Sequence, residues 1–445
     1  MVSQKQPRDR ALEAKLAFHR DLKKHFNGPL EKVEIISRHF RSTSWVDLQP
    51  AVEKLLATCE RVELFGVKSS EYRADVVTLS DLLAVPSFGS PDIGATTFID
   101  LPDIGERRLR NGLWLAVGDV PIAILVTGST LQIAATRGNG VYVDACIRAI
   151  EKTITTASTL RGRVISLVSS RGFGKSDGVN VHNLRQVSRE EVILPAKTLE
   201  VLDANVTAFI RARQAMKNLG FSGKKGLLFY GPPGTGKTHT IHYLASQLPG
   251  HTTLLLGADD LGDVSEYFDL ARFLQPAMIV IEDVDLIATA RRGVTGGSGA
   301  ELILNKLLNE MDGLLPDADV FVVLTTNAPE TLESALVSRP GRIDQTIEFP
   351  LPDDESRSRL IKLYAGRLVL SSEMIVDIVK RTAGASGAFI KELMRRCAQY
   401  HIETSGQGIL QQAAIDYAMD QMLFQGGTLN LKLLGGTGIG FSTAA

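Results

Sequence analysis

The spacing of apolar positions near the start of the chain is helical. Residues 9–26 carry apolar side chains on one helical stripe, so we expect an amphipathic helix there. The members of this stripe are Leu12, Leu16, Leu22 and Phe26. Further helices are expected near residues 31–40 and over residues 45–59. The pattern therefore predicts an N-terminal helical segment over residues 1–60.

From residue 61 the pattern changes to short apolar runs that are typical of strands. These runs are RVELFGV, ATTFIDL, LQIAATRG and RVISLVSS. The longer stretch Gly112–Gly128 contains Asp119 and Pro121, so it predicts two strands around a Gly-Asp turn rather than a membrane span. A helix is expected over residues 141–160. Together these elements predict a mixed α+β domain over residues 61–190, for partner recognition or as a scaffold.

From about residue 190 nearly continuous apolar runs alternate with helical patterns, beginning with a helix over residues 198–219. The runs are GLLFYG, TTLLLG, AMIVIED and VFVVLTT. Strands this apolar are buried on both faces, so the alternation predicts a parallel sheet covered by helices. We expect this α/β nucleotide-binding core over residues 191–353, a helical lid over 354–424 and a Gly/Thr-rich tail over 425–445.

Composition excludes several classes of protein. Apolar residues make up 44% of the chain and charged residues 22%, which is ordinary for a folded protein. A formal net charge of -1 gives no overall attraction to nucleic acid or anionic membranes. Three widely separated cysteines fit neither a disulfide framework nor a zinc cluster. Because the N-terminus also lacks an apolar signal core, we expect a cytoplasmic protein.

The segment Gly231–Thr238 reads GPPGTGKT, which is the phosphate loop or Walker A motif. Its glycines let successive backbone N–H groups turn toward phosphate oxygens, assisted by the N-terminus of the helix that follows. Lys237 would bridge the β- and γ-phosphates, and the Thr238 hydroxyl would ligate magnesium. The sequence therefore predicts a site for ATP and Mg²⁺. The residues expected to contact the nucleotide are Gly231, Gly234, Thr235, Gly236, Lys237 and Thr238.

A second chemical signal is the acidic pair Glu282-Asp283, which follows the apolar run AMIVI. We expect Glu282 to hold the magnesium shell and Asp283 to polarise the attacking water. The usual order in such sites is Asp then Glu, so the base here is one methylene shorter. Displacements of about 1 Å can cost roughly a hundredfold in rate, which predicts slow turnover. The alternative is a solvated acidic strand end without a catalytic role.

Polar residues after the next apolar run complete the candidate site. Asn327 ends the run VFVVLTT and could hydrogen-bond both the lytic water and the γ-phosphate, although a strand-end Asn by itself is more often a turn residue. Arg339 and Arg342 flank a Pro-Gly turn. They form either ordinary surface salt bridges or arginine fingers that reach a neighbouring subunit's γ-phosphate. Fingers that act across subunits require an oligomer.

In combination, residues from about 190 to 424 resemble an AAA-family ATPase of the AAA+ superfamily. The motifs that carry the resemblance are GPPGTGKT, IVIEDVD, LLNEMDGL, TTNAPETLESALVSRPGRIDQTIEFPLPD and GASGAFIKEL. They are similar to those of the proteasomal ATPases and of the segregase that unfolds ubiquitylated proteins. The Glu-Asp order resembles the mitochondrial translocase of the Rieske iron–sulfur protein.

This resemblance implies a parallel α/β core with a helical lid, nucleotide bound between neighbours, and a ring that is usually a hexamer. It assigns Asn327 as the sensor and Arg339 and Arg342 as the fingers. It also assigns Gly387 and Ala388 to a lid position near the nucleotide, where related ATPases often use an arginine. Mg²⁺-dependent hydrolysis of ATP is the implied activity.

Three functions follow from these features. The first is an ATP-hydrolysing ring that remodels, unfolds or translocates a protein partner chosen by residues 1–190. The second is a nucleotide-gated assembly scaffold with slow hydrolysis, favoured by the Glu-Asp order and by the lack of an aromatic pore loop, for which Leu261-Gly262 is the nearest candidate. The third is a nucleic-acid motor. It is disfavoured because the modest basic excess in the first 41 residues has no interleaved aromatic residues.

Overall fold

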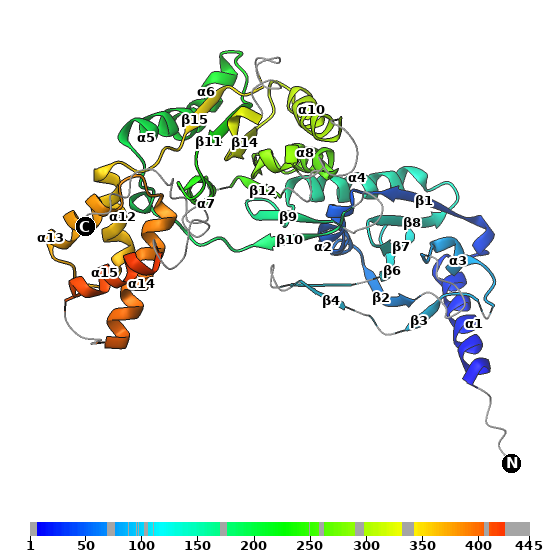
Figure 1. The fold of residues 1–445 in the computed structure, drawn as a ribbon. Coiled ribbons are helices and arrows are strands. Elements are labelled where there is room, and N and C mark those ends of the chain that lie inside the picture. Colours follow the sequence, from blue (N-terminus) through cyan, green and yellow to red (C-terminus); the bar gives the residue numbers. More distant parts are fainter. Residues whose placement is uncertain are drawn as a thin grey trace. The chain divides into compact units, whose positions relative to one another are not determined.

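The structure is a computed structural model of the 445-residue chain, shown in Figure 1. It describes residues 7–68, 76–87, 89–94, 96, 98–101, 106–109, 111–169, 176–248, 250–257, 262–289, 298–331, 342–404 and 409–422. The chain divides into two compact units. The first comprises Met1–Arg161 and Leu167–His182, and the second comprises Gly162–Ser166 and Asn183–Ala445.

The first unit is built on an antiparallel sheet with strand order β1-β8-β7-β6-β2-β3. Its strands are β1 (Val33–His39), β2 (Arg61–Lys68), β3 (Asp92–Gly94), β6 (Asn111–Val117), β7 (Pro121–Thr127) and β8 (Thr130–Thr136). The strands β4 (Phe98–Leu101) and β5 (Glu106–Leu109) form a separate antiparallel pair. The remaining elements are α1 (Pro7–His25), α2 (Trp45–Leu56), α3 (Leu79–Leu83), α4 (Gly140–Thr156) and β10 (Ser176–His182).

Two local predictions in this unit have opposite outcomes. The hairpin expected within Gly112–Gly128 is confirmed, because β6 pairs antiparallel with β7 around the turn at Gly118. The helix expected near residues 31–40 is wrong, because Val33–His39 forms strand β1 and pairs with β8. The β-branched pair Ile35-Ile36 suits a strand. The deciding interaction is a backbone ladder to a strand about a hundred residues later, which no local pattern contains.

The second unit contains a parallel sheet with strand order β9-β12-β13-β14-β11-β15, which confirms the predicted α/β class. Its strands are β9 (Val164–Ser169), β11 (Lys225–Tyr230), β12 (Thr252–Leu256), β13 (Ala277–Ile281), β14 (Val320–Thr326) and β15 (Gln345–Glu348). Of β9, residues 164–166 belong to this unit and the rest to the first unit, where β10 is its neighbour. Val164 and Ile165 of β9 pair with β12, so a strand from before residue 190 joins this sheet. The segment around β9 carries no motif that would have indicated this pairing.

Helices cover both faces of the sheet, as the apolar strands require. Every residue of β13 and β14 is buried. Alternate residues of the strands, such as Phe229 and Phe321, pack against Ile241 and Leu244 of α7 and against Leu202 of α5. Helix α8 lies against β12 and β13. The helices of this core are α5 (Ala196–Asp203), α6 (Phe209–Asn218), α7 (Lys237–Gln247), α8 (Val264–Phe273), α9 (Val284–Thr289) and α10 (Ser298–Asp312), with a π-helical turn over Ala204–Ala208 joining α5 to α6.

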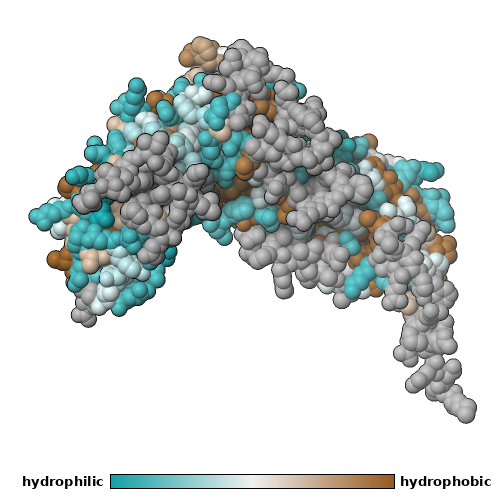
Figure 2. Space-filling view, viewed as in Figure 1, coloured by the Kyte–Doolittle hydropathy of each residue, from teal (hydrophilic) through white to brown (hydrophobic). Residues whose placement is uncertain are grey.

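The C-terminal part of the second unit is a small helical bundle. Its helices are α12 (Asp354–Ala365), α13 (Ser372–Arg381), α14 (Gly387–Thr404) and α15 (Gln412–Asp420). Asp353 and Ser371 cap the first two helices by accepting hydrogen bonds from backbone N–H groups of the following turn. The apolar faces of these helices form a separate core, while hydrophilic residues cover much of the bundle in the view of Figure 2.

Across the described part of the chain, no helix is both long enough and apolar enough to cross a membrane. The tail over residues 425–445 lies outside the described residues.

Candidate functional site

The phosphate loop connects the end of β11 to the start of α7, as its motif predicts. Its backbone requires glycine at several positions. At Gly231, φ is 146°, and a Cβ atom there would collide with the carbonyl oxygen of Phe349. Gly234 and Gly236 have φ values of 75° and 101°, in the left-handed region that favours glycine. These glycines turn the loop around the N-terminus of α7, which is the arrangement that binds phosphate oxygens.

Lys237 is the buried cation of this loop. Its side chain is 7% exposed, and its ammonium donates hydrogen bonds to the carbonyl oxygens of Gly231 at 2.7 Å and Pro232 at 3.0 Å. It also donates to Oδ1 of Asn327 at 2.8 Å. The Thr235 hydroxyl donates to Pro232 as well, which tightens the loop. The ammonium is therefore held at the carboxyl edge of the sheet by neutral acceptors.

Thr238 and Glu282 lie together across the gap between the loop and β13. The Thr238 hydroxyl donates a hydrogen bond of 2.7 Å to Oε1 of Glu282, the first residue after β13. A hydroxyl and a carboxylate are oxygen ligands of the kind that Mg²⁺ prefers. No group of three or more His, Cys, Asp or Glu side chains in the described residues could hold a metal alone. Mg²⁺ is commonly bound by one or two carboxylates together with substrate phosphates.

Asp283 is held in an unusual backbone conformation beside Asn327. Its φ is 49°, one of two positive values among the described residues other than glycine. Asp tolerates this left-handed region better than most residues. Its N–H donates to the Thr325 hydroxyl at 2.9 Å, and its carboxylate accepts from Nδ2 of Asn327 at 3.0 Å. Asn327 therefore joins Lys237 to Asp283 in one hydrogen-bonded chain.

Asp285 is a positioning residue that the sequence analysis missed. Its buried carboxylate accepts hydrogen bonds from the Thr326 hydroxyl at 2.9 Å and the Asn327 N–H at 3.1 Å. Burial lowers the pKa of Lys237, and the negative charges of Asp283 and Asp285 act in the opposite direction. Asp285 lies within the motif IVIEDVD, two residues after the acidic pair. This proximity was the sequence signal that could have identified it as part of the site.

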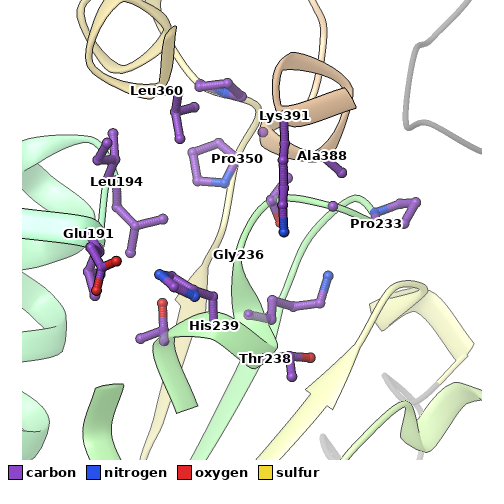
Figure 3. A pocket seen from close by; sticks show the side chains of 18 of the residues that line it. Glu191, Leu194, Pro233, Gly236, Thr238, His239, Pro350, Leu360, Ala388 and Lys391 are labelled. Carbon is purple, nitrogen blue, oxygen red and sulfur yellow. The ribbon is translucent and has the colours of Figure 1, made fainter. Parts of the chain in front are cut away.

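A pocket of about 410 Å³ adjoins the loop and is shown in Figure 3. One end includes Lys237, Asp283 and Asn327, and apolar side chains form much of the remaining wall. These apolar residues include Val192, Ile193, Leu194, Pro350, Leu360 and Tyr364. An apolar wall with a few convergent polar groups is typical of a site for a small ligand. The size and polarity of the pocket suit a nucleotide whose phosphates lie at the loop.

The C-terminal helical bundle, which the sequence analysis predicted as a lid, contributes to this pocket directly. Gly387 and Ala388 line it at the start of α14, and the Ala388 N–H donates to the carbonyl oxygen of Gly234 at 3.1 Å. His239, also missed by the sequence analysis, lies in the pocket between Thr238 and the segment that contains Glu191, as Figure 3 shows. Burial lowers the pKa of His239, which favours the neutral imidazole.

Arg342, one of the two predicted arginines, lies away from this cluster. Arg342 is near the amino end of β11, where its backbone approaches Gly226, whereas the phosphate loop follows the carboxyl end of the same strand. Its guanidinium forms an ion pair with Asp312, and its side chain is 11% exposed. Arg339 and Leu261 lie outside the described residues. The structure thus connects Lys237 to Asp283 through Asn327. It also joins Thr238 to Glu282, whereas Arg342 lies apart from these residues.

A comparison with protein families agrees with this geometry. The family model described as "ATPase family associated with various cellular activities (AAA)" matches residues 227–351. The match starts in β11 and ends after β15, so it includes the phosphate loop, the acidic pair and Asn327. The chain carries an AAA ATPase domain. ATP binding and hydrolysis are the activities that this family implies. The whole first unit and the helical bundle lie outside the matched range.

Proposed function

We propose that this protein is a Mg²⁺-dependent ATPase that assembles into a ring and uses hydrolysis to remodel, unfold or translocate a protein partner. The observation that carries the proposal is the hydrogen-bonded chain from Lys237 through Asn327 to Asp283, which is centred on one edge of the parallel sheet. This arrangement supports the proposal, because a γ-phosphate and its attacking water would need a cation, an amide and a carboxylate close together.

The roles of the individual groups follow from their contacts. The loop N–H groups and the ammonium of Lys237 bind the phosphates and stabilise the negative charge that hydrolysis redistributes. Thr238 and Glu282 would hold Mg²⁺, which supplies positive charge beside the β- and γ-phosphates. Asp283 orients the attacking water and accepts its proton. Asn327 fixes the carboxylate of Asp283 through its amide nitrogen.

The distance between Arg342 and the phosphate loop of the same chain supports assembly of several copies into an oligomer. Gly226, which lies beside Arg342, and Gly231 are separated by five residues of extended strand, or about 16 Å at 3.3 Å per residue. Because Arg342 lies at the opposite edge of the sheet, it cannot serve the pocket of its own chain. A finger role for Arg342 therefore needs a neighbouring copy, and we propose the same role for Arg339. AAA ATPases commonly form rings, and we propose a hexamer.

A second candidate function is a nucleotide-gated assembly scaffold with slow hydrolysis. It is favoured by the ion pair between Arg342 and Asp312, which holds the guanidinium inside its own chain. Hydrolysis would then wait until a neighbouring copy displaces Asp312. The side chain of Asp283, which is one methylene shorter than the usual glutamate, also favours slow hydrolysis. Under either function, we assign the choice of partner to residues 1–190, most of which belong to the first unit.

The ring proposal predicts that ATP turnover per chain rises cooperatively with protein concentration and that Arg342→Ala lowers it about a thousandfold, since a finger is typically worth about 10³ to 10⁵ in rate. ATP affinity should change little, because Arg342 does not line the nucleotide pocket. Phosphate release and equilibrium binding measure the two quantities. Asp312→Ala is the matched control, because it breaks the same ion pair but keeps the guanidinium.

Mixing two inactive variants separates action across subunits from an effect on folding. Arg342→Ala keeps an intact pocket, and Asp283→Asn keeps an intact finger, so mixed rings should recover part of the activity. Unchanged turnover in Arg342→Ala alone would refute the shared site, and so would a lack of recovery when two inactive variants are mixed.

The remodelling function predicts that an unfolded protein stimulates ATP turnover several-fold, whereas single-stranded DNA does not. Stimulation follows because a partner bound to a ring would favour the hydrolysis-competent arrangement of neighbours. Steady-state phosphate release with a chemically unfolded protein, its folded form and an oligonucleotide tests this. Turnover that depends on protein concentration but not on any of these additions would support the scaffold instead.

A further inference from the structure

A lysine of the lid lies at the nucleotide pocket. Lys391 is in the second turn of α14, three residues after Ala388. Residues three apart share one face of a helix, so Lys391 lies on the face whose Ala388 N–H contacts Gly234 of the phosphate loop. Both residues line the same pocket. Figure 3 shows the side chain of Lys391 extending from α14 toward the loop near Gly236.

Lys391 differs in its partners from four of the arginines of the lid. These four, Arg357, Arg381, Arg395 and Arg396, each form an ion pair with a carboxylate. Lys391 pairs with no carboxylate in the part of the lid and core that the structure describes, and its ammonium lies 6.0 Å from the centre of the Tyr364 ring. The adjacent Glu392 is engaged by both Arg395 and Arg396, which lower its pKa to about 2. The positive charge of Lys391 is therefore available to a ligand.

The position of the Lys391 ammonium indicates which part of a bound nucleotide it can contact. Tyr364 and Leu360 belong to the apolar wall, whereas Gly234 and Gly236 belong to the phosphate loop. Lys391 lies between them, and an extended lysine places its ammonium about 6 Å from its own Cα. The phosphates bound by the loop lie on this side of the pocket. A compact ammonium donates hydrogen bonds readily to phosphate oxygens.

We propose that Lys391 binds the phosphate oxygens that ADP and ATP have in common, from the lid side of the pocket. This inference rests on the proposed ATPase function. Lys237 would hold the phosphates from the core and Lys391 from the lid, so bound nucleotide would connect the two parts. Loss of nucleotide would release the lid from this connection. Lys391 is thus a phosphate-binding residue at a place where the sequence analysis found only Gly387 and Ala388.

The test compares Lys391→Ala with Lys380→Ala, which removes an exposed lysine from α13 of the same lid. Calorimetric binding of ADP should weaken about tenfold in Lys391→Ala, the effect of one partly exposed charge-assisted hydrogen bond. Lys380→Ala should match the wild type. Lys391→Arg should recover most of the loss. Adenosine, measured by competition with a fluorescent ADP analogue, should bind equally well to all variants.

Three outcomes would count against the inference. Equal ADP affinity in Lys391→Ala and Lys380→Ala would overturn it and leave the ATPase proposal intact. An equal loss for adenosine and ADP would show that Lys391 acts on the base or on the lid's structure rather than on phosphate. Failure of the wild type itself to bind ADP or ATP would overturn the proposed function and this inference together. Thermal unfolding of each variant verifies that the exposed substitution leaves the fold unchanged.

Discussion

Replacing Asp283 with asparagine is expected to lower ATP turnover at least about a hundredfold while ATP affinity stays within about threefold of the wild type. The carboxylate would act as the general base, a role typically worth 10² to 10⁴ in rate. Asparagine also tolerates the left-handed backbone at this position, where φ is 49°. Its amide can still pair with Asn327. The substitution therefore removes the base and preserves the local structure.

Phosphate release under saturating Mg²⁺ and ATP measures this effect, and calorimetric titration measures ATP binding. Glu282→Gln is the matched control, since it neutralises the neighbouring carboxylate that contacts Thr238. That variant should require a higher Mg²⁺ concentration for half-maximal activity. If Asp283→Asn instead loses its response to Mg²⁺ while Glu282→Gln loses only turnover, the two acids have exchanged roles. In that case the two acids would stand in reversed order along the chain, but an aspartate would still hold Mg²⁺ and a glutamate would still act as the base.

Replacing Lys237 with alanine is expected to weaken ATP binding about a hundredfold. Its buried ammonium is hydrogen-bonded to Gly231, Pro232 and Asn327, and phosphate oxygens can take the place of these neutral acceptors. Hydrogen bonds to a charged group contribute about 1.5–3 kcal/mol, which corresponds to roughly a tenfold to hundredfold change in affinity. The variant also leaves the Asn327 amide with one partner fewer, so its turnover should be lost as well.

Lys197→Ala removes an exposed lysine from α5 of the same unit and serves as the control for this substitution. Equilibrium binding of a fluorescent ATP analogue compares the two variants, and thermal unfolding verifies that both are folded. ATP affinity in Lys237→Ala equal to that of Lys197→Ala would place the nucleotide elsewhere. The ATPase proposal would then lose the contact on which it depends most.

Local patterns in the sequence predicted much of the second unit. The motif Gly231–Thr238 predicts a loop between a buried strand and a helix. The structure confirms this, because the segment connects β11 to α7. Buried parallel strands are apolar throughout, so β13 and β14 could be identified from their composition. The first unit was harder to predict, because Val33–His39 becomes a strand through pairing with β8 rather than through its own spacing.

The sequence by itself determined the α/β class, the phosphate loop and the residue types that surround a nucleotide, because these depend on spacings of a few residues within one segment. Only the tertiary structure decided which distant groups meet. It joins Asn327 to Lys237 and Asp283, pairs Arg342 with Asp312, and brings Lys391 of the lid to the pocket. Such contacts join segments tens of residues apart, and strand order and helix packing set them. No pattern along the chain encodes that order, because the free energy that selects it comes from burying whole faces of strands and helices together.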